Sequence, residues 1–406
     1  MCAARGGKPI RKESIRMENE TKRFVYADNA ATTPVAPEVA AEMQPYFESC
    51  WGNPSSIYKK GLEAKHAITD ARGRIASHLG CTARELFFTS CGSESDNWAI
   101  KGAVMASGKK HVIVSEIEHP AVLRTADTLE KFGCRVTRLG VDHDGVIRLD
   151  QLEAALDTET AVVAVMTANN EIGTLEPVAE AARLAHKAGA LMFTDAVQAM
   201  GAIPLNVDEL GVDLLSFSGH KINAPKGIGG LYIRRGTKLS RFLDGGGQES
   251  GRRGGTENVP YIMGLARAVD LAHERMADND RIRGMRDRLI AGLTALPYAH
   301  LNGHPTKRLP GNVNVTFRYI EGESMLLLLD MAGICVSTGS ACSSNSLEPS
   351  HVLLACGVPV EDAHGSLRLS LGHQNTDADV DYILETLPGV VQRLRNMSPI
   401  YPGNVK

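Results

Sequence analysis

Lys221 is the residue whose position first suggests covalent chemistry. It follows the run DLLSFS and precedes the glycine-rich segment KGIGG. A single lysine in a loop is usually a solvated surface residue. A partly desolvated lysine, however, has a nucleophilic amine that can form a Schiff base. The sequence therefore offers Lys221 as a candidate Schiff-base lysine, with a solvated surface lysine as the alternative.

Asp195 is the acid that such chemistry would need. Pyridoxal phosphate (PLP) forms Schiff bases with lysine, and its ring withdraws electrons when a carboxylate pairs with the pyridinium nitrogen. Asp195 ends the run ALMFTD, and its alternative role is to cap the helix that follows. A phosphate also needs backbone N–H groups and hydroxyls at a helix start. The stretch TSCGSESDNWAIKG supplies a turn at Gly92 and a hydroxyl at Ser93.

Cys342 has an unusual setting for a thiol. It lies in STGSACSSNS, in which all the remaining residues are Ser, Thr, Gly, Ala or Asn. Such a stretch predicts a surface loop. Cys81 and Cys356 instead lie beside apolar runs, which is typical of core thiols. A free thiol has a pKa of about 8.5 and must be activated before it attacks as a thiolate. Cys342 is therefore a candidate nucleophile.

The elements that must position these residues alternate between strand and helix patterns from about residue 60 to 235. The β-rich runs are ELFFT, KHVIVS, RVTRL, TAVVAVMT, ALMFTD, DLLSFS and GGLYIRR. This alternation predicts an α/β domain with a mostly parallel sheet. Five of the runs are followed by polar clusters, and the carboxyl ends of strands form the ligand crevice of such a sheet. We therefore expect one site at that edge.

A second, smaller domain is predicted after the long helical region that begins near residue 257. GNVNVTF, ESMLLLLDMAG, HVLLACG and GSLRLSLG mix strand and helix patterns, as an α+β domain does. We expect a disordered extension over 1–23 and a large PLP-binding domain over 24–275, whose first residues pack on the small domain. The small domain then covers 276–406 and carries the cysteine loop, 337–350.

Composition narrows the classes of function. The hydrophobic fraction is 43% and the charged fraction 22%, which is ordinary for a globular protein. The net charge of −3 gives no reason to expect a nucleic acid or an anionic membrane as a partner. The eight cysteines include no CxxC pair, so we expect free thiols in a reducing, cytoplasmic compartment and no intrinsic metal site.

A series of motifs, in order, resembles one family. They are YADNAATTPVAPEV, GNPSS, ESDNWAIKG, EIEHPAV, NNEIGT, TDAVQ, FSGHKINAPKGIGGLY, GGGQESGRRGGTEN and STGSACSSNSLEPS. Over nearly the whole chain the sequence resembles class I cysteine desulfurases of the NifS/IscS type, which are fold-type I PLP enzymes of the class V aminotransferase family. The resemblance implies a large domain with a mostly parallel seven-stranded sheet and a smaller α+β domain.

The resemblance also implies an activity and its partners. L-Cysteine would be converted to L-alanine, and its sulfur would pass as a persulfide on Cys342 to an acceptor protein, for which an iron–sulfur scaffold is the family expectation. Cys342 could also ligate a cluster iron transiently. A mobile thiol suits this task, because one sulfur must visit the cofactor and then the surface.

The resemblance further assigns cofactor roles. Lys221 would form the Schiff base, Asp195 would pair with the pyridinium nitrogen, and Gln198 would bond the phenolic oxygen. His119 would stack on the ring and shuttle protons; its alternative role is that of a helix-start histidine. The phosphate would be held by Gly92, Ser93, Ser218, His220 and the partner's Thr256.

Two further roles concern the substrate and the assembly. Asn170 would contact cofactor and substrate, and Arg368 would bind the substrate carboxylate as a bidentate pair. The role of the partner's Thr256 implies an obligate homodimer with shared active sites. The family often has threonine at the position of Ser93, and Cys91 beside it is a second thiol near the cofactor, for which a buried structural role is favoured.

Other activities remain open on the same fold. A selenocysteine lyase would act on the heavier chalcogen, and an aminotransferase would release a keto acid. A non-catalytic scaffold is the alternative from a different class, and the presence of Lys221, Asp195, His119 and Cys342 argues against it. The acceptor could also serve nitrogenase maturation or tRNA thiolation rather than general cluster assembly.

Overall fold

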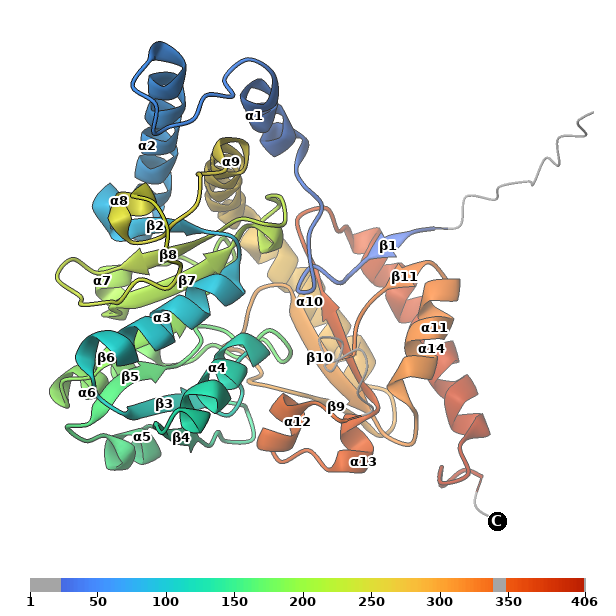
Figure 1. Ribbon diagram of the computed structural model, residues 1–406. Helices are drawn as coiled ribbons and strands as arrows, with labels where there is room; N and C mark the ends of the chain where they lie inside the picture. Colours follow the sequence, from blue (N-terminus) through green and yellow to red (C-terminus); the bar gives the residue numbers. More distant parts are fainter. Residues whose placement is uncertain (1–22, 339–347, 405–406) are drawn as a thin grey trace, which may run out of the picture.

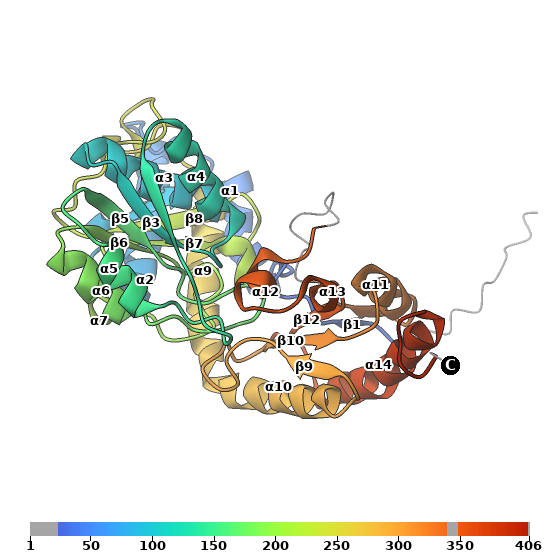
Figure 2. The same ribbon diagram turned by 90° about the horizontal axis from the view of Figure 1, so that it is seen from below.

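The computed structural model describes residues 23–338 and 348–404, which form two bodies, each with its own sheet (Figures 1 and 2). The larger body contains seven strands in the order β2-β8-β7-β6-β5-β3-β4. They are β2 (Leu86–Thr89), β3 (His111–Ser115), β4 (Arg135–Leu139), β5 (Thr160–Ala164), β6 (Leu191–Asp195), β7 (Leu214–Ser218) and β8 (Gly229–Ile233). β8 runs antiparallel to β2 and β7, and the other pairings are parallel. The predicted α/β fold with a mostly parallel seven-stranded sheet is confirmed.

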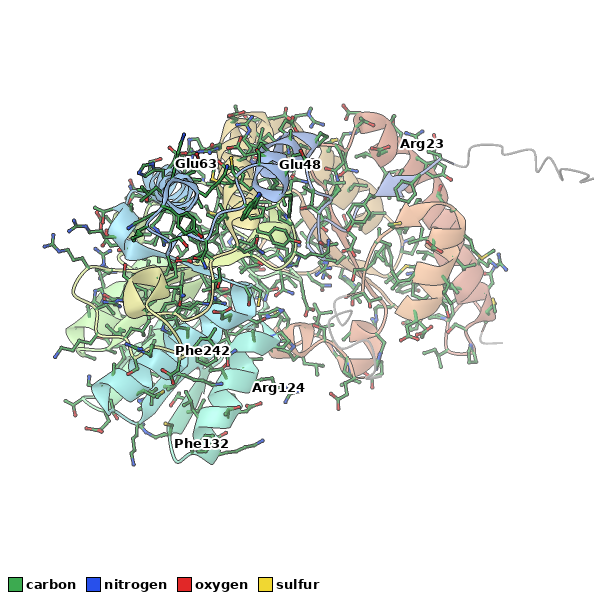
Figure 3. The ribbon with its side chains drawn as sticks, turned by 45° about the horizontal axis from the view of Figure 1, so that its top comes forward. Arg23, Glu48, Glu63, Arg124, Phe132 and Phe242 are labelled. Atoms are coloured by element: carbon green, nitrogen blue, oxygen red, sulfur yellow. The ribbon has the colours of Figure 1, made fainter. Side chains whose placement is uncertain are left out.

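Both faces of this sheet are covered because successive side chains on a strand point to opposite sides. Phe193 packs in the apolar cluster under α3 (Gly92–Ser107) and α4 (Pro120–Lys131), whereas Met192 packs in the cluster on the other face. The second face carries α1 (Pro37–Glu48), α2 (Lys59–Leu79), α5 (Leu149–Ala155), α6 (Val178–Lys187), α7 (Val207–Leu210) and α9 (Val259–Arg275). Arg124 and Phe132 point outward from the α4 region (Figure 3).

Short elements connect these helices and strands. They are the single turns η1 (Ala83–Glu85), η2 (Gly219–Lys221), η3 (Met276–Asp278) and α8 (Gln248–Gly251). In α8, Glu249 and Ser250 have positive φ angles of 47° and 58°, a region that non-glycine residues seldom adopt.

The smaller body has an antiparallel sheet in the order β12-β10-β9. Its strands are β9 (Ala299–Leu301), β10 (Asn312–Phe317) and β12 (Ser366–Ser370), and its long helices are α10 (Asn279–Thr294), α11 (Gly322–Met331) and α14 (Asp377–Met397). One apolar cluster joins these helices to the sheet. The short helices α12 (His351–Ala355) and α13 (Val360–Ala363) lie on the side facing the larger body (Figure 2).

The amino-terminal segment runs from the smaller body to the larger one. β1 (Val25–Tyr26) pairs in parallel with β11 (Ile334–Cys335), and Asp28 then forms a bridge with Ser370 at the end of β12. The following residues reach the crevice between the two bodies and lead into α1 (Figure 1). Among the helices of the described residues, none has the length and apolar character needed to cross a membrane.

Candidate active site

The predicted site residues gather at the carboxyl ends of the strands of the large sheet. His119 follows β3, Asn170 follows β5, Asp195 ends β6 and Lys221 lies in η2, just after β7; Gly92 opens α3 after β2. The predicted polar clusters therefore meet at one edge, as expected for an open α/β sheet.

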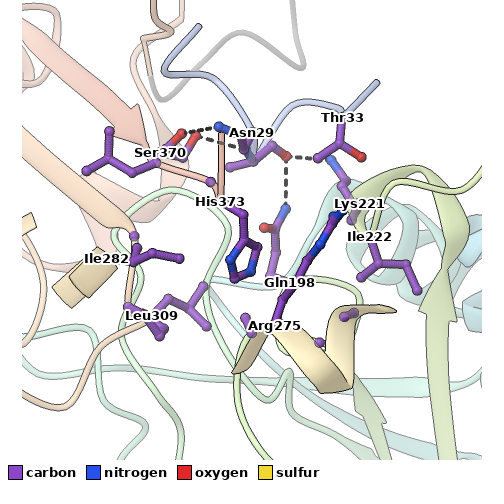
Figure 4. Close-up of a pocket in the computed structure, with 18 of the residues that line it drawn as sticks. Asn29, Thr33, Gln198, Lys221, Ile222, Arg275, Ile282, Leu309, Ser370 and His373 are labelled. Carbon is purple, nitrogen blue, oxygen red and sulfur yellow. Dashed lines mark hydrogen bonds between the residues drawn. The ribbon is translucent and has the colours of Figure 1, made fainter. Parts of the chain in front are cut away.

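Lys221 points toward the amino-terminal segment. Its Nζ donates hydrogen bonds to the backbone oxygens of Ala30 at 2.5 Å and Ala31 at 2.8 Å. The Nε2 of Gln198 donates to the same Ala30 oxygen at 3.0 Å. These groups border a cavity of about 130 Å³ between the bodies, into which Arg275 and His373 also point (Figure 4). The structure thus brings Lys221 and Gln198 together.

Asp195 is a buried carboxylate at the base of the site. It is 5% exposed, and its Oδ1 accepts from the Val197 backbone N–H at 2.8 Å. Burial raises the pKa of Asp195 to about 6, while the Val197 hydrogen bond and the Lys221 ammonium oppose that rise. Asp195 is therefore mainly ionised at neutral pH although it is buried.

Asp96 is a neighbour of Asp195 that the sequence analysis missed. It is 1% exposed and accepts from Ser216 Oγ at 2.6 Å; Ser216 in turn lies beside Asp195 in the sheet. Burial and the charge of Asp195 raise the pKa of Asp96 well above its usual value. The negative charge of the pair therefore resides on Asp195. The motif ESDN contained this residue, but nothing in its spacing linked it to Asp195.

His119 lies at the start of α4, which is the alternative role considered for it. Its Nδ1 accepts from the Ala121 backbone N–H at 3.1 Å, which makes it the N-cap of the helix. Burial, followed by the charges of Lys221 and His351, lowers the pKa of His119 to about 4. The ring is thus neutral near pH 7, and because Nδ1 accepts, Nε2 carries the proton.

The start of α3 is shaped to receive an anion. A Cβ atom at Gly92 would lie 2.9 Å from Val197 Cγ2 and 3.5 Å from Ser218 Cβ, so only glycine leaves this space open. Ser93 follows in the first turn of this 16-residue helix, whose free N–H groups favour a phosphate. His220 lies beside Lys221, and its Nδ1 is 3.2 Å from Thr32 Oγ1. These groups have the chemistry that a phosphate requires.

Within a single chain, Thr256 is not among the residues that line the cavity beside Lys221. It is exposed and lines a second cavity of about 210 Å³, together with Thr89, Ser90 and Glu249. That cavity shares no lining residue with the one beside Lys221. Its predicted role, which needs the partner subunit, stays a prediction.

Arg368 lies in the middle of β12 and is 2% exposed. Its Nη1 donates to the Asn170 backbone oxygen at 3.0 Å, and its Nη2 donates to Asp28 Oδ1 at 2.9 Å. The structure thus joins two predicted substrate residues, and Asp28 is a partner that the sequence analysis missed. The motif YADNAATT contained it without indicating a contact 340 residues away. Cys342 lies outside the described residues.

Comparison with known proteins gives the family. Residues 25–383 match the model of the aminotransferase class-V family. A cysteine desulfurase IscS of Methanosarcina thermophila is 54% identical over 393 residues, which are 96% of this chain and 96% of that protein. The chain belongs to the cysteine desulfurases of this family. A cysteine desulfurase IscS of Clostridium botulinum strain Hall is 50% identical over 94% of this chain and 98% of that protein.

Solved structures agree with this family. A NifS-like protein has a TM-score of 0.86 and 39% identity, with coverage of 92% of this chain and 100% of that chain. The structure of SspA in complex with cysteine has a TM-score of 0.76 and 35% identity, and covers 86% of this chain and 99% of that one. The predicted fold-type I architecture is thereby confirmed.

Cysteine desulfurases of this family depend on PLP, and so does this enzyme. The donor set fits the cofactor: a lysine amine, a buried ionised carboxylate, an amide and a helix start opened by Gly92. No group of three or more His, Cys, Asp or Glu side chains in the described part of the chain is placed to hold a metal ion.

Proposed function

We propose that this cysteine desulfurase takes sulfur from L-cysteine, releases L-alanine and holds the sulfur as a persulfide on Cys342 for an acceptor protein. The observation that carries the proposal is the identity of 54% with a cysteine desulfurase over 96% of the chain. It is supported by the position of Lys221, Asp195 and His119, which lie together at the carboxyl ends of neighbouring strands of the large sheet.

The cofactor, when bound, supplies an electron sink for the substrate carbon atoms. Lys221 would hold the cofactor and would move the proton at the substrate Cα through its Nζ. Asp195, which keeps its negative charge because Asp96 holds its own proton, would pair with the pyridinium nitrogen. Gln198 would bond the phenolic oxygen, and Gly92, Ser93, Ser218 and His220 would hold the phosphate.

His119 and Arg368 act on the substrate side. His119 would lie beside the cofactor and shuttle protons from its neutral form, in which Nε2 carries the proton. Arg368 binds the carboxylate, and Asn170 contacts substrate and cofactor. The Cys342 thiolate attacks the substrate sulfur, so that an S–S bond forms and the C–S bond breaks. The electron pair of the broken bond stays on the substrate Cβ, which takes a proton to become the methyl group of alanine.

The assembly and setting are part of the proposal. A homodimer would bring the partner's Thr256 to the phosphate, and an iron–sulfur scaffold is the proposed acceptor. The described cysteines are unpaired, namely Cys50, Cys81, Cys91, Cys134, Cys335 and Cys356, which supports a reducing, cytoplasmic setting. We place the cofactor domain at 24–275 and the small domain at 276–406, and separate apolar clusters around the two sheets support this division.

Mass spectrometry of the purified holoenzyme after brief incubation with L-cysteine tests the proposal. We expect one added sulfur on the peptide that contains Cys342, together with released alanine. If the cofactor is bound and no sulfur is added, the substrate assignment is wrong. Rates on L-cysteine and L-selenocysteine measured side by side then test the selenocysteine lyase alternative, and a keto acid product would indicate an aminotransferase.

A further inference from the structure

The guanidinium of Arg368 has a buried donor that no described residue satisfies. Nη1 bonds the Asn170 oxygen and Nη2 bonds Asp28, but Nε has no hydrogen-bond partner within residues 23–338 and 348–404. Leaving a buried donor unpaired costs about 1–3 kcal/mol. A ligand oxygen that accepts from Nε would remove this cost.

The backbone on both sides of the Asp28–Arg368 pair is fixed. Arg368 exchanges backbone hydrogen bonds with Ser337, at 2.7 and 3.1 Å, and is paired with Asn314 of β10 on its other side. Asp28 is flanked by bonds to Ser370: the Ser370 N–H donates to the Ala27 oxygen at 2.7 Å, and the Asn29 N–H donates to the Ser370 oxygen at 3.2 Å. The ion pair therefore has little freedom to reorient.

We propose that Asp28 is a positioning residue of the substrate site, which orients Arg368 so that its Nε edge receives the substrate carboxylate. A carboxylate binds arginine best through two parallel N–H donors. Asn170 and Asp28 each take one of the five N–H groups; of the three that remain, Nε–H and the second Nη2 proton form one edge for the ligand. Asp28 also neutralises a guanidinium whose side chain is only 3% exposed. The inference rests on the proposed role of Arg368.

The same segment sets the distance between the two ends of an α-amino acid. Asp28 contacts Arg368, and the backbone oxygens of Ala30 and Ala31 accept from Lys221 Nζ. Asn29 and Lys221 both line the cavity between the two bodies (Figure 4). A carboxylate anchor and an amine position that share one short segment are held at a fixed separation, which favours substrates with that spacing.

Equilibrium binding to the holoenzyme tests the inference with two ligands that differ only in the carboxylate. L-Alanine and ethylamine are titrated into the wild type, Asp28→Ala, Asp28→Asn and Arg368→Ala, with cofactor absorbance as the readout. Asp362→Ala is the matched control. Asp362 accepts a hydrogen bond from Arg318 Nε whose length, 2.9 Å, equals that of the Asp28–Arg368 bond, and this pair lies away from the site. KM and kcat for L-cysteine are measured in parallel.

We expect Asp28→Ala to weaken L-alanine binding about 10- to 100-fold, the size of a lost hydrogen bond to a charged group. Ethylamine binding should stay within about twofold, and the effect on L-cysteine should fall on KM more than on kcat. Asp28→Asn keeps an acceptor oxygen and should lie between the wild type and Asp28→Ala, and Asp362→Ala should behave as the wild type.

The inference is overturned if Asp28→Ala leaves L-alanine binding unchanged or weakens both ligands equally. If Asp28→Ala does not fold or loses its cofactor, the same comparison on Asp28→Asn decides. A wrong assignment of Arg368 as the carboxylate-binding residue gives a different result. Arg368→Ala would then leave L-alanine binding unchanged, whatever the effect of the Asp28 substitutions.

Discussion

His119 and Lys221 reach the crevice from different strands, and burial of the imidazole together with the nearby Lys221 ammonium lowers the pKa of His119 to about 4. The imidazole is therefore neutral at neutral pH, and Nε2 carries its proton because Nδ1 accepts from the Ala121 N–H. In the proposed mechanism His119 thus starts with Nε2–H as a hydrogen-bond donor.

The first prediction concerns acid stability. The folded chain binds the His119 proton only near pH 4, whereas the unfolded chain binds it near pH 6.5. Since the unfolded chain binds more protons between these values, stability falls as pH decreases from about 6.5 to 4, by about 3 kcal/mol at most. In urea unfolding, the free energy of unfolding of His119→Gln should therefore fall less between pH 7 and 4 than that of the wild type. The control is His143→Gln, because the His143 side chain is 85% exposed, and an equal acid loss in His119→Gln and the wild type would contradict the assignment.

The second prediction separates the nucleophile from the other thiols. Burial raises the pKa of Cys81 and of Cys356 to about 12, so neither forms a thiolate at neutral pH. Cys342→Ala should keep the cofactor absorbance and abolish sulfide release, whereas Cys81→Ala should keep most of the activity. Alanine and sulfide assays on the purified variants check this. Full activity in Cys342→Ala would show that another group accepts the sulfur.

The third prediction tests the phosphate cradle with two glycines. Gly92→Ala places a methyl group 2.9 Å from Val197 Cγ2, an overpacking that costs about 1–3 kcal/mol and narrows the anion site. Gly73 in α2 has no atom within 4 Å of such a methyl group, so Gly73→Ala should stabilise the helix by about 1 kcal/mol. Cofactor affinity, measured by equilibrium dialysis, should fall only in Gly92→Ala. An equal affinity in both variants would remove Gly92 from the phosphate site.

The sheet could be predicted from sequence because its strands carry their signals locally. Each run, such as LFFT in β2 or HVIVS in β3, is short, apolar and followed by a polar cluster. The edge at which those clusters meet follows from parallel pairing alone. The sequence alone therefore predicts that Asp195, His119 and Lys221 lie near one another.

Contacts between residues far apart in the sequence could not be predicted in this way. Asp28 accepts from Arg368 across 340 positions of sequence, beside an isolated bridge between Asp28 and Ser370, and no periodic pattern marks such a contact. Asp96 has the appearance of a polar residue in the first turns of a helix, and only the packing of α3 on β7 brings it to Ser216. Burial of Asp96 is a property of the folded layers, so the rise in its pKa has no local signal in the sequence.

The last prediction concerns the strained turn that precedes Thr256. Glu249 has a φ of 47° and is 6% exposed, and its carboxylate accepts two hydrogen bonds from Arg72, each 2.7 Å, and one from the Phe88 backbone N–H at 2.9 Å. Removing one partner of a buried ion pair leaves the other uncompensated, which costs about 3–5 kcal/mol. We therefore expect Arg72→Ala to lower the free energy of unfolding by about that amount in urea titrations.

The matched control is Lys187→Ala, because the pair of Lys187 with Glu153 has side chains 77% and 60% exposed. Exposed pairs contribute about 0–1 kcal/mol, so this variant should unfold almost as the wild type does. Arg72→Ala should also release its cofactor faster if the turn positions Thr256 for the partner subunit. A large loss of stability with unchanged cofactor release would mean that the Arg72–Glu249 pair stabilises the fold without positioning Thr256.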